Sequence, residues 1–191
     1  MAVLGKVRSA MLFRCGRMLA YFRMHARALR AFEAAIDADP GHRQAWSCAG
    51  FLHARGERFD AAFGAFEHAR AIDPADAPAS FNAGYMLQRA GRHEEALERL
   101  RRAVELDPLV DRAWYAQGLS LMQLDRFEES ALALDEAARL NPRNPYAGYY
   151  LARVLYRLGR HDEVLAQYRR VKDVDATVSE RIRLEFGVAQ K

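Results

Sequence analysis

Apolar and polar residues follow one another in short runs of helical spacing along most of this chain. In one run, Trp114, Gly118 and Leu121 recur three or four residues apart, which places them on one face of a helix. A short polar interruption follows, and Phe127 and Leu134 then belong to a second run with helical spacing. The pattern predicts short helices arranged in pairs.

The helix pairs recur at an interval of 34 residues. Proline stands at the end of four copies, at Pro40, Pro74, Pro108 and Pro142, and it stops a helix because it has no amide hydrogen to donate. Small or apolar residues hold the same interval in four further columns. These columns are Gly16, Gly50, Gly84, Gly118 and Ala152; Ala28, Ala62, Ala96, Ser130 and Val164; Phe32, Phe66, Leu100, Leu134 and Tyr168; and Ala35, Ala69, Ala103, Ala137 and Val171. This common register predicts a tandem repeat.

The repeated columns resemble the tetratricopeptide repeat family. The family pattern of Trp, Leu-Gly, Tyr, Ala, Phe, Ala and Pro corresponds in one copy to Trp46, Ala49, Gly50, His53, Ala62, Phe66, Ala69 and Pro74. The resemblance covers residues 9–178. It implies an all-α fold in which antiparallel helix pairs stack into a right-handed superhelical solenoid. It also implies that the first helix of each pair lines a concave groove.

The turn between the two helices of a copy varies in sequence. Gly91 and Gly159 occupy it in two copies, whereas Asp125 stands there in another. Arg23 occupies the position in the first copy, where the family usually has glycine, and the second copy has Gly56 one residue early.

The register divides the chain into five repeats between two terminal segments. The repeats span residues 9–42, 43–76, 77–110, 111–144 and 145–178. Residues 1–8 are expected to extend the first helix, and residues 179–191 to form a carboxy-terminal capping helix. Around this cap, Val178, Ile182 and Phe186 should lie against the last repeat, while Glu185 should meet solvent.

Composition adds little to this picture. Of the 191 residues, 51% are hydrophobic and 28% charged, which is the balance of a globular chain. No stretch reaches the roughly 18 apolar residues of a membrane span, so no transmembrane segment is expected. Cys15 and Cys48 are too few to staple the fold, which favours a reducing, cytoplasmic location or a simple packing role for both cysteines. The high usage of arginine and alanine favours a bacterial source.

The predicted first helices carry aromatic residues and arginines but almost no acid. Asp111, at a helix start, is their one acidic residue, and the other acids fall in the second helices and the loops. Some aromatic residues, such as Phe81 and Tyr149, are expected to pack between repeats. The candidate partner-binding groove consists of Phe13, Arg14, Arg17, Phe51, Arg55, Asn82, Tyr85, Arg89, Arg112, Tyr115, Leu119, Met122, Tyr146, Tyr150, Arg153, Tyr156 and Arg157.

This basic and aromatic face predicts a non-catalytic adaptor or scaffold that binds an acidic and apolar segment of a partner protein. Arginine pairs with carboxylates through forked hydrogen bonds, and tyrosine offers contact area with little loss of entropy. Two alternatives stay open. One is a secretion-type chaperone for an export substrate. The other is electrostatic binding of an anionic surface, nucleic acid or lipid, although a net charge of +4 gives little support for nucleic acid. The oligomeric state is not indicated.

The sequence offers no catalytic or cofactor-binding motif. Its six histidines lack metal-ligand spacing, and there is no glycine-rich phosphate loop. The paired acids in "GRHEEAL" and "GRHDEVL" begin helices, where negative charge is favoured by the helix dipole. We therefore expect neither enzyme activity nor a bound cofactor or metal.

Overall fold

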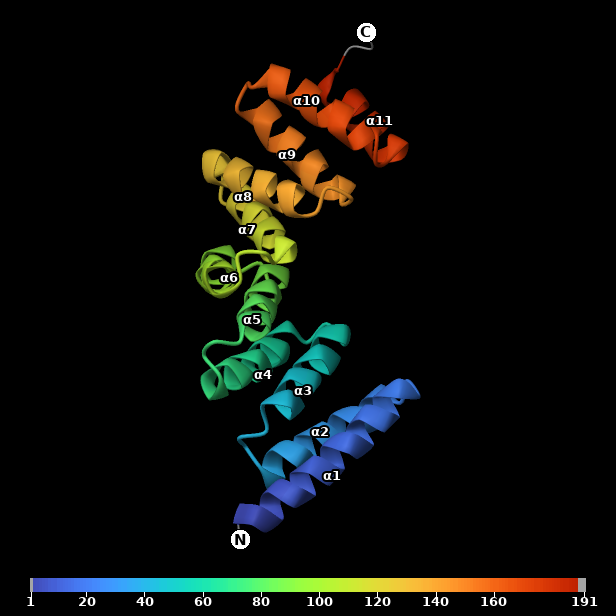
Figure 1. The fold of residues 1–191 in the computed structure, drawn as a ribbon, viewed down its shortest axis with the longest axis vertical. Coiled ribbons are helices and arrows are strands. Elements are labelled where there is room, and N and C mark those ends of the chain that lie inside the picture. The colour runs from blue at the N-terminus through green and yellow to red at the C-terminus, as the bar shows by residue number, and fades with distance from the viewer. Residues whose placement is uncertain (1, 189–191) are drawn as a thin grey trace. The chain divides into compact units, whose positions relative to one another are not determined.

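A computed structural model describes residues 2–188, which form eleven α-helices and no β-strand (Figure 1). The helices are α1 (Ala2–Tyr21), α2 (His25–Ala38), α3 (Arg43–Arg55), α4 (Phe59–Ile72), α5 (Ala77–Arg89), α6 (His93–Leu106), α7 (Asp111–Gln123), α8 (Phe127–Leu140), α9 (Pro145–Arg157), α10 (His161–Lys172) and α11 (Ala176–Phe186). Met1 and residues 189–191, parts of the predicted extension and cap, lie outside the described residues. The predicted all-α fold of paired helices is confirmed.

The helices group into two compact units. One unit ends at Gly91 and holds α1 to α5, and the other begins at Arg92 and holds α6 to α11. The division falls between the two helices of the predicted repeat 77–110. Within each unit, helices that follow one another in the chain pack together, as α1 does on α2 and α7 on α8.

Glycine in the first helix of a pair lets a side chain of the second helix come close. A Cβ atom at Gly16 would stand 2.6 Å from Phe32 Cε1, and one at Gly118 would stand 2.5 Å from Leu134 Cγ. Gly50 has an equivalent contact in the second pair. The Phe32 and Leu134 side chains are buried. Two of the repeated columns therefore record the packing of one helix on the next.

A left-handed residue joins the two helices of every pair. Arg23, Glu57, Gly91, Asp125 and Gly159 have φ values from 55° to 78° and stand 34 residues apart. Glycine adopts this conformation freely, whereas a side chain with a Cβ atom meets the following carbonyl oxygen. The turns at Arg23, Glu57 and Asp125 are therefore strained.

An aspartate ends three of the second helices just before the repeated proline. The Oδ1 atom of Asp39 accepts a hydrogen bond of 3.1 Å from the backbone N–H of Gly41, and Asp107 makes the same contact with Leu109. Asp73 forms the third such turn. These side chains satisfy the backbone where proline breaks the helix.

The first turns of α1 lie against the end of α2. Gly5 permits this approach, because a Cβ atom there would stand 2.7 Å from the carbonyl oxygen of Ala38. One turn later, the buried Ser9 hydroxyl donates a hydrogen bond of 2.7 Å to the carbonyl oxygen of Ala35. Through these contacts α1 extends to 20 residues, whereas α3 has 13.

α11 packs on the last helix pair. It begins after Asp175, whose Oδ1 accepts hydrogen bonds from the backbone N–H groups of Thr177 and Val178. Val178 and Ile182 are buried, and Phe186 packs beside them against the core of the second unit. The predicted contact of these three apolar side chains with the last repeat is confirmed.

Candidate partner-binding surface

We call α1, α3, α5, α7 and α9 the first helices, and α2, α4, α6, α8 and α10 the second helices. The first helices contain one acidic residue, Asp111, at the start of α7. Its carboxylate accepts a hydrogen bond of 2.8 Å from Nδ2 of Asn141, which follows α8. This acid is therefore already bound within its own helix pair.

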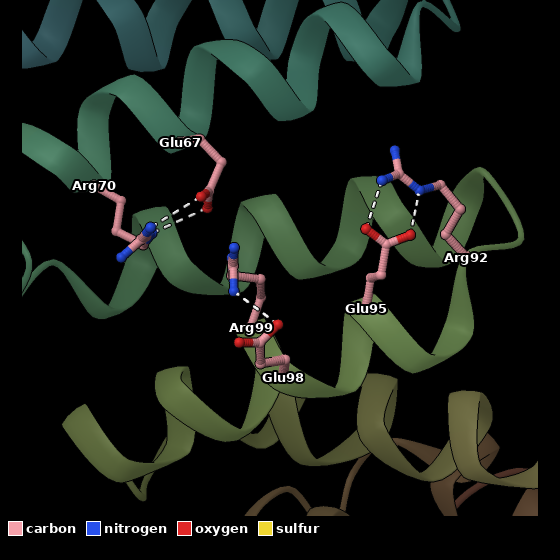
Figure 2. Close-up of polar contacts among 6 residues, drawn as sticks. All are labelled: Glu67, Arg70, Arg92, Glu95, Glu98 and Arg99. Atoms are coloured by element: carbon pink, nitrogen blue, oxygen red, sulfur yellow. Dashed lines mark hydrogen bonds and ion pairs between the residues drawn. The ribbon is translucent and has the colours of Figure 1, made fainter.

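Several acids of the second helices are paired with arginine. Figure 2 shows Arg70 bound through two hydrogen bonds to Glu67 in α4, and Arg92 bound in the same way to Glu95 at the start of α6. The hydrogen bond from Arg92 lowers the pKa of Glu95. Equivalent pairs start the next two second helices, namely Arg126 with Glu129 and Arg160 with Glu163.

Phe13 belongs to the core of the first unit, so the prediction that it faces a partner is corrected. Its side chain is only 9% exposed, and its ring packs 5.7 Å from that of Phe32 and 4.7 Å from that of His42, between centroids. Arg14 and Arg17 on the same helix are exposed. The Arg17 guanidinium lies 5.9 Å from the centroid of the Phe13 ring.

The candidates on α3 and α5 have different surroundings. Phe51 is 54% exposed, although one edge of its ring contacts the core of its own helix pair. Arg55 is exposed, whereas Asn82 and Tyr85 are half-buried. The Tyr85 ring stacks on Phe81 with the centroids 5.9 Å apart. Phe51 is thus the most accessible of the candidate aromatic side chains in the first unit.

Two candidate arginines pack on rings of the preceding helix pair. The Arg89 guanidinium lies 4.9 Å from the centroid of Phe59, and that of Arg157 lies 5.1 Å from the centroid of Phe127. The two contacts occupy equivalent positions, 68 residues apart. A cation over a ring at an exposed site is stabilised by about 0.5–1 kcal/mol. These arginines therefore join neighbouring helix pairs as well as presenting charge.

The remaining candidates gather on α7 and α9, which are neighbours in the second unit. Tyr115 of α7 and Tyr150 of α9 meet edge to face with their centroids 6.0 Å apart. Both are half-buried, and Tyr146 is 51% exposed. We define the α7–α9 surface as Arg112, Tyr115, Leu119, Met122, Tyr146, Tyr150, Arg153 and Tyr156.

α11 brings an acid to the edge of the α7–α9 surface. The Tyr149 hydroxyl donates a hydrogen bond of 2.5 Å to Glu185 Oε2, and Glu185 Oε1 lies 3.9 Å from Arg153 Nε. Burial and the bond to Glu185 raise the pKa of Tyr149 above its ordinary value. Glu185 is exposed, as expected, but it also binds Tyr149, so this edge of the surface is not free of acid.

Helical spacing contained the signal for this contact. Glu185 follows Val178 by seven residues and Ile182 by three, so it shares their face of α11. Phe186 lies next to that face, and its ring centroid is 5.2 Å from that of Tyr156. An acid in an otherwise apolar stripe therefore marked a residue directed toward α9.

Comparison with known proteins gives the family and the fold. The sequence model of the tetratricopeptide repeat (TPR) family matches residues 16–77, 81–145 and 115–177. The crystal structure of MamA protein matches with a TM-score of 0.83 at 16% identity, covering 96% of this chain and 98% of that chain. MamA from Desulfovibrio magneticus RS-1 gives 0.82 at 18% identity, covering 89% and 96%. YrrB, a TPR protein with an unusual peptide-binding site, gives 0.78 at 19% identity, covering 91% and 90%. No curated protein matches the sequence.

These solved structures are too distant in sequence to show more than a shared fold. The family matches, in contrast, cover most of the chain and follow the columns that pack Gly16 on Phe32 and Gly118 on Leu134. Proteins built from tetratricopeptide repeats generally act as non-catalytic modules of protein–protein interaction. The chain belongs to the tetratricopeptide repeat family.

Proposed function

We propose that the protein is an adaptor that binds an acidic and apolar segment of a partner protein on the α7–α9 surface. The observation that carries this proposal is the group of partly exposed tyrosines, Tyr115, Tyr146 and Tyr150, beside the exposed Arg153. Tyrosine supplies a large contact area with few rotatable bonds and a hydroxyl that can reach a polar group. Such residues are typical anchors of protein interfaces.

Arg153 supplies the charge that favours an acidic segment. Its side chain is 48% exposed, and the 3.9 Å distance to Glu185 leaves the ion pair loose. An exposed pair of this kind contributes about 0–1 kcal/mol, so a partner carboxylate can displace Glu185 at small cost. The guanidinium would then form two parallel hydrogen bonds with the incoming carboxylate.

A peptide ligand is also consistent with the similarity to YrrB, whose structure is described as having a peptide-binding site. That likeness supports the class of ligand and not its sequence. The preference for acid rests on Arg153 and on the scarcity of acid in the first helices.

The proposal is tested with a variant that changes two exposed positions, Tyr146→Ser with Arg153→Gln. Wild type and variant would be used to capture partners from the native cell, and each captured protein would be identified by mass spectrometry. Its binding segment would then be synthesised and titrated. We expect the segment to contain acidic and apolar residues and the variant to bind it about tenfold more weakly or worse.

A matched control changes one large exposed hydrophobic residue and one arginine on the second helix α8, as Leu132→Ser with Arg139→Gln. Leu132 is 74% exposed and the Arg139 side chain 65% exposed, so the control removes a comparable exposed surface. Both variants should keep the helical circular dichroism of the wild type. Equal loss of binding in both variants, or full binding by Tyr146→Ser with Arg153→Gln, would place the partner elsewhere.

A further inference from the structure

α1 exposes a row of large apolar side chains on the side away from α2. Leu4 is 80% exposed, Met11 68% and Tyr21 82%, and Val7 and Met18 are exposed by 56% and 57%. α1 packs along α2 and forms the amino-terminal edge of the first unit (Figure 1). An exposed apolar row of this length on a surface helix indicates that another apolar surface, of a protein or a membrane, contacts the helix.

These five residues form one stripe. Successive positions in an α-helix are rotated by about 100°, which places Leu4, Val7, Met11, Met18 and Tyr21 within an arc of about 100°. The buried residues of α1 lie on the opposite side of the helix and are Ser9, Phe13 and Gly16. α1 therefore has two apolar faces, of which α2 covers one. We call the exposed face the α1 stripe.

The charge of α1 is entirely positive. Lys6, Arg8, Arg14 and Arg17 lie in this helix, and Ala2–Tyr21 contains no aspartate or glutamate. By helical rotation, Lys6 and Arg17 fall on one flank of the stripe and Arg8 on the other, while Arg14 lies within its arc. Long basic side chains at such positions can keep their stems on the apolar face and their charged ends in the polar layer.

We propose that the α1 stripe binds the surface of an anionic lipid bilayer, with α1 lying in the plane of the interface. An exposed apolar face bordered by lysine and arginine is the pattern of helices that bury one side at the boundary between headgroups and acyl chains. Basic residues near the surface add attraction to acidic lipids. This function is separate from the partner binding proposed for the α7–α9 surface.

The charge pattern argues against a second copy of the chain as the occupant. Two α1 stripes placed face to face would bring Lys6, Arg8, Arg14 and Arg17 of each copy together with no acid on either helix. Like charges at that distance repel. None of the helices in the described residues is long and apolar enough to cross a membrane.

The experiment measures sedimentation of the full chain with vesicles of phosphatidylcholine, with or without phosphatidylglycerol. We expect binding to the vesicles that contain phosphatidylglycerol, and weaker binding as salt is raised, because salt screens the basic residues. The variant Leu4→Ser, Met11→Ser, Met18→Ser should bind about tenfold more weakly or worse. Those side chains are exposed, so the change should leave the helical circular dichroism unaltered.

A matched control replaces three equally exposed leucines of the second unit, as Leu109→Ser, Leu132→Ser, Leu184→Ser. They are 74%, 74% and 69% exposed, so this variant loses as much exposed apolar surface but should bind vesicles as the wild type does. The variant Tyr146→Ser with Arg153→Gln should also bind vesicles normally. Loss of partner capture and loss of vesicle binding are thus separable.

A fluorescent label placed on Cys15 reports whether α1 enters the interface. Cys15 is exposed and Cys48 is half-buried, so a Cys48→Ser background restricts an environment-sensitive dye to α1. Its emission should shift to the blue with anionic vesicles. A dye on Leu132→Cys, in a background without the native cysteines, should not shift.

Three results would overturn the proposal. The first is an absence of wild-type binding to anionic vesicles at low salt, and the second is equal binding by the stripe variant. The third is a wild-type dimer in light scattering that the stripe variant converts to a monomer without any vesicle binding, because a second copy would then be the occupant.

Discussion

The Tyr149 hydroxyl of α9 donates a hydrogen bond of 2.5 Å to the Glu185 carboxylate of α11. Tyr149 is only 2% exposed, because α11 covers a ring in the same repeat column as the half-buried Tyr115. Arg181 completes the contact from α11, with its guanidinium 4.7 Å from the centroid of the Tyr149 ring. α11 therefore buries Tyr149 of α9, whereas the equivalent Tyr115 of α7 stays partly exposed.

Removing this hydroxyl should loosen α11. Tyr149→Phe keeps the ring but leaves Glu185 without its donor, and we expect a loss of about 1–2 kcal/mol, since hydrogen bonds to charged groups are among the stronger ones. Amide hydrogen exchange should show faster exchange within α11 and little change in α1. Tyr146→Phe removes an exposed hydroxyl and should have no such effect.

The second variant of a double-mutant cycle is Glu185→Gln. If the two side chains act through one bond, Tyr149→Phe with Glu185→Gln should destabilise the protein little more than either change alone. Fully additive effects would show that the hydrogen bond does not couple them.

Two helical glycines should respond to alanine in opposite directions. Gly64 lies within α4, and a Cβ atom there would have no neighbour within 4 Å, so Gly64→Ala should stabilise by about 0.5–1 kcal/mol. A Cβ atom at Gly118 would stand 2.5 Å from Leu134 Cγ, so Gly118→Ala should destabilise by about 1–3 kcal/mol. Urea unfolding followed by circular dichroism measures both. Changes of the same sign would contradict the close packing at Gly118.

The turns of the second and third helix pairs, which hold Gly56 and Gly91, provide another matched comparison. Gly91 has φ 78° and open space around a Cβ atom, so Gly91→Ala should destabilise by about 1–2 kcal/mol through the backbone alone. Gly56 has φ −89°, and its nearest Cβ contact is an ordinary 3.5 Å, so Gly56→Ala should be neutral or stabilising. Thermal unfolding of both variants measures these changes in stability. An equal loss of stability in both variants would contradict the difference in backbone conformation between Gly91 and Gly56.

The sequence predicted the repeated contacts well because each one recurs. The column of Gly16 and the column of Phe32 meet in space, so a pattern repeated along the chain identified one contact several times. The interval also gives the position of the turn better than residue type does. Gly56 looked like the turn residue, but Glu57 lies 34 residues before Gly91 and adopts the left-handed conformation.

Contacts at the ends of the stack were harder to predict because the interval does not govern them. α11 begins at its own cap, Asp175, and Glu185 stands 36 residues after Tyr149. Phe13 shares the column of Tyr149, and it is likewise buried by neighbours that only the structure reveals. The sequence therefore indicated which helices carry the candidate site. The residues at the edges of the site could be assigned only once the positions of the terminal helices were known.

His53 should make stability depend on pH near neutrality. It stands where the family pattern has tyrosine, and its Nδ1 atom is buried without a hydrogen-bond partner. Burial, and next the positive charge of Arg58, lower the pKa of His53 in the folded protein. Protonation therefore favours the unfolded chain. The contribution of neutral His53 is complete above the unfolded pKa of about 6.5, and it is lost as the pH falls through the folded value.

The variant His53→Tyr tests this prediction. His53 borders a pocket of about 350 Å³ whose walls include Ala61 and Gly64, so a tyrosine ring has room there. Melting temperatures of wild type and variant would be compared between about pH 8 and pH 5, the range in which histidine titrates. We expect the wild type to lose more stability than the variant as the pH falls. The other histidines are present in both proteins, so parallel curves would show that His53 does not carry the effect.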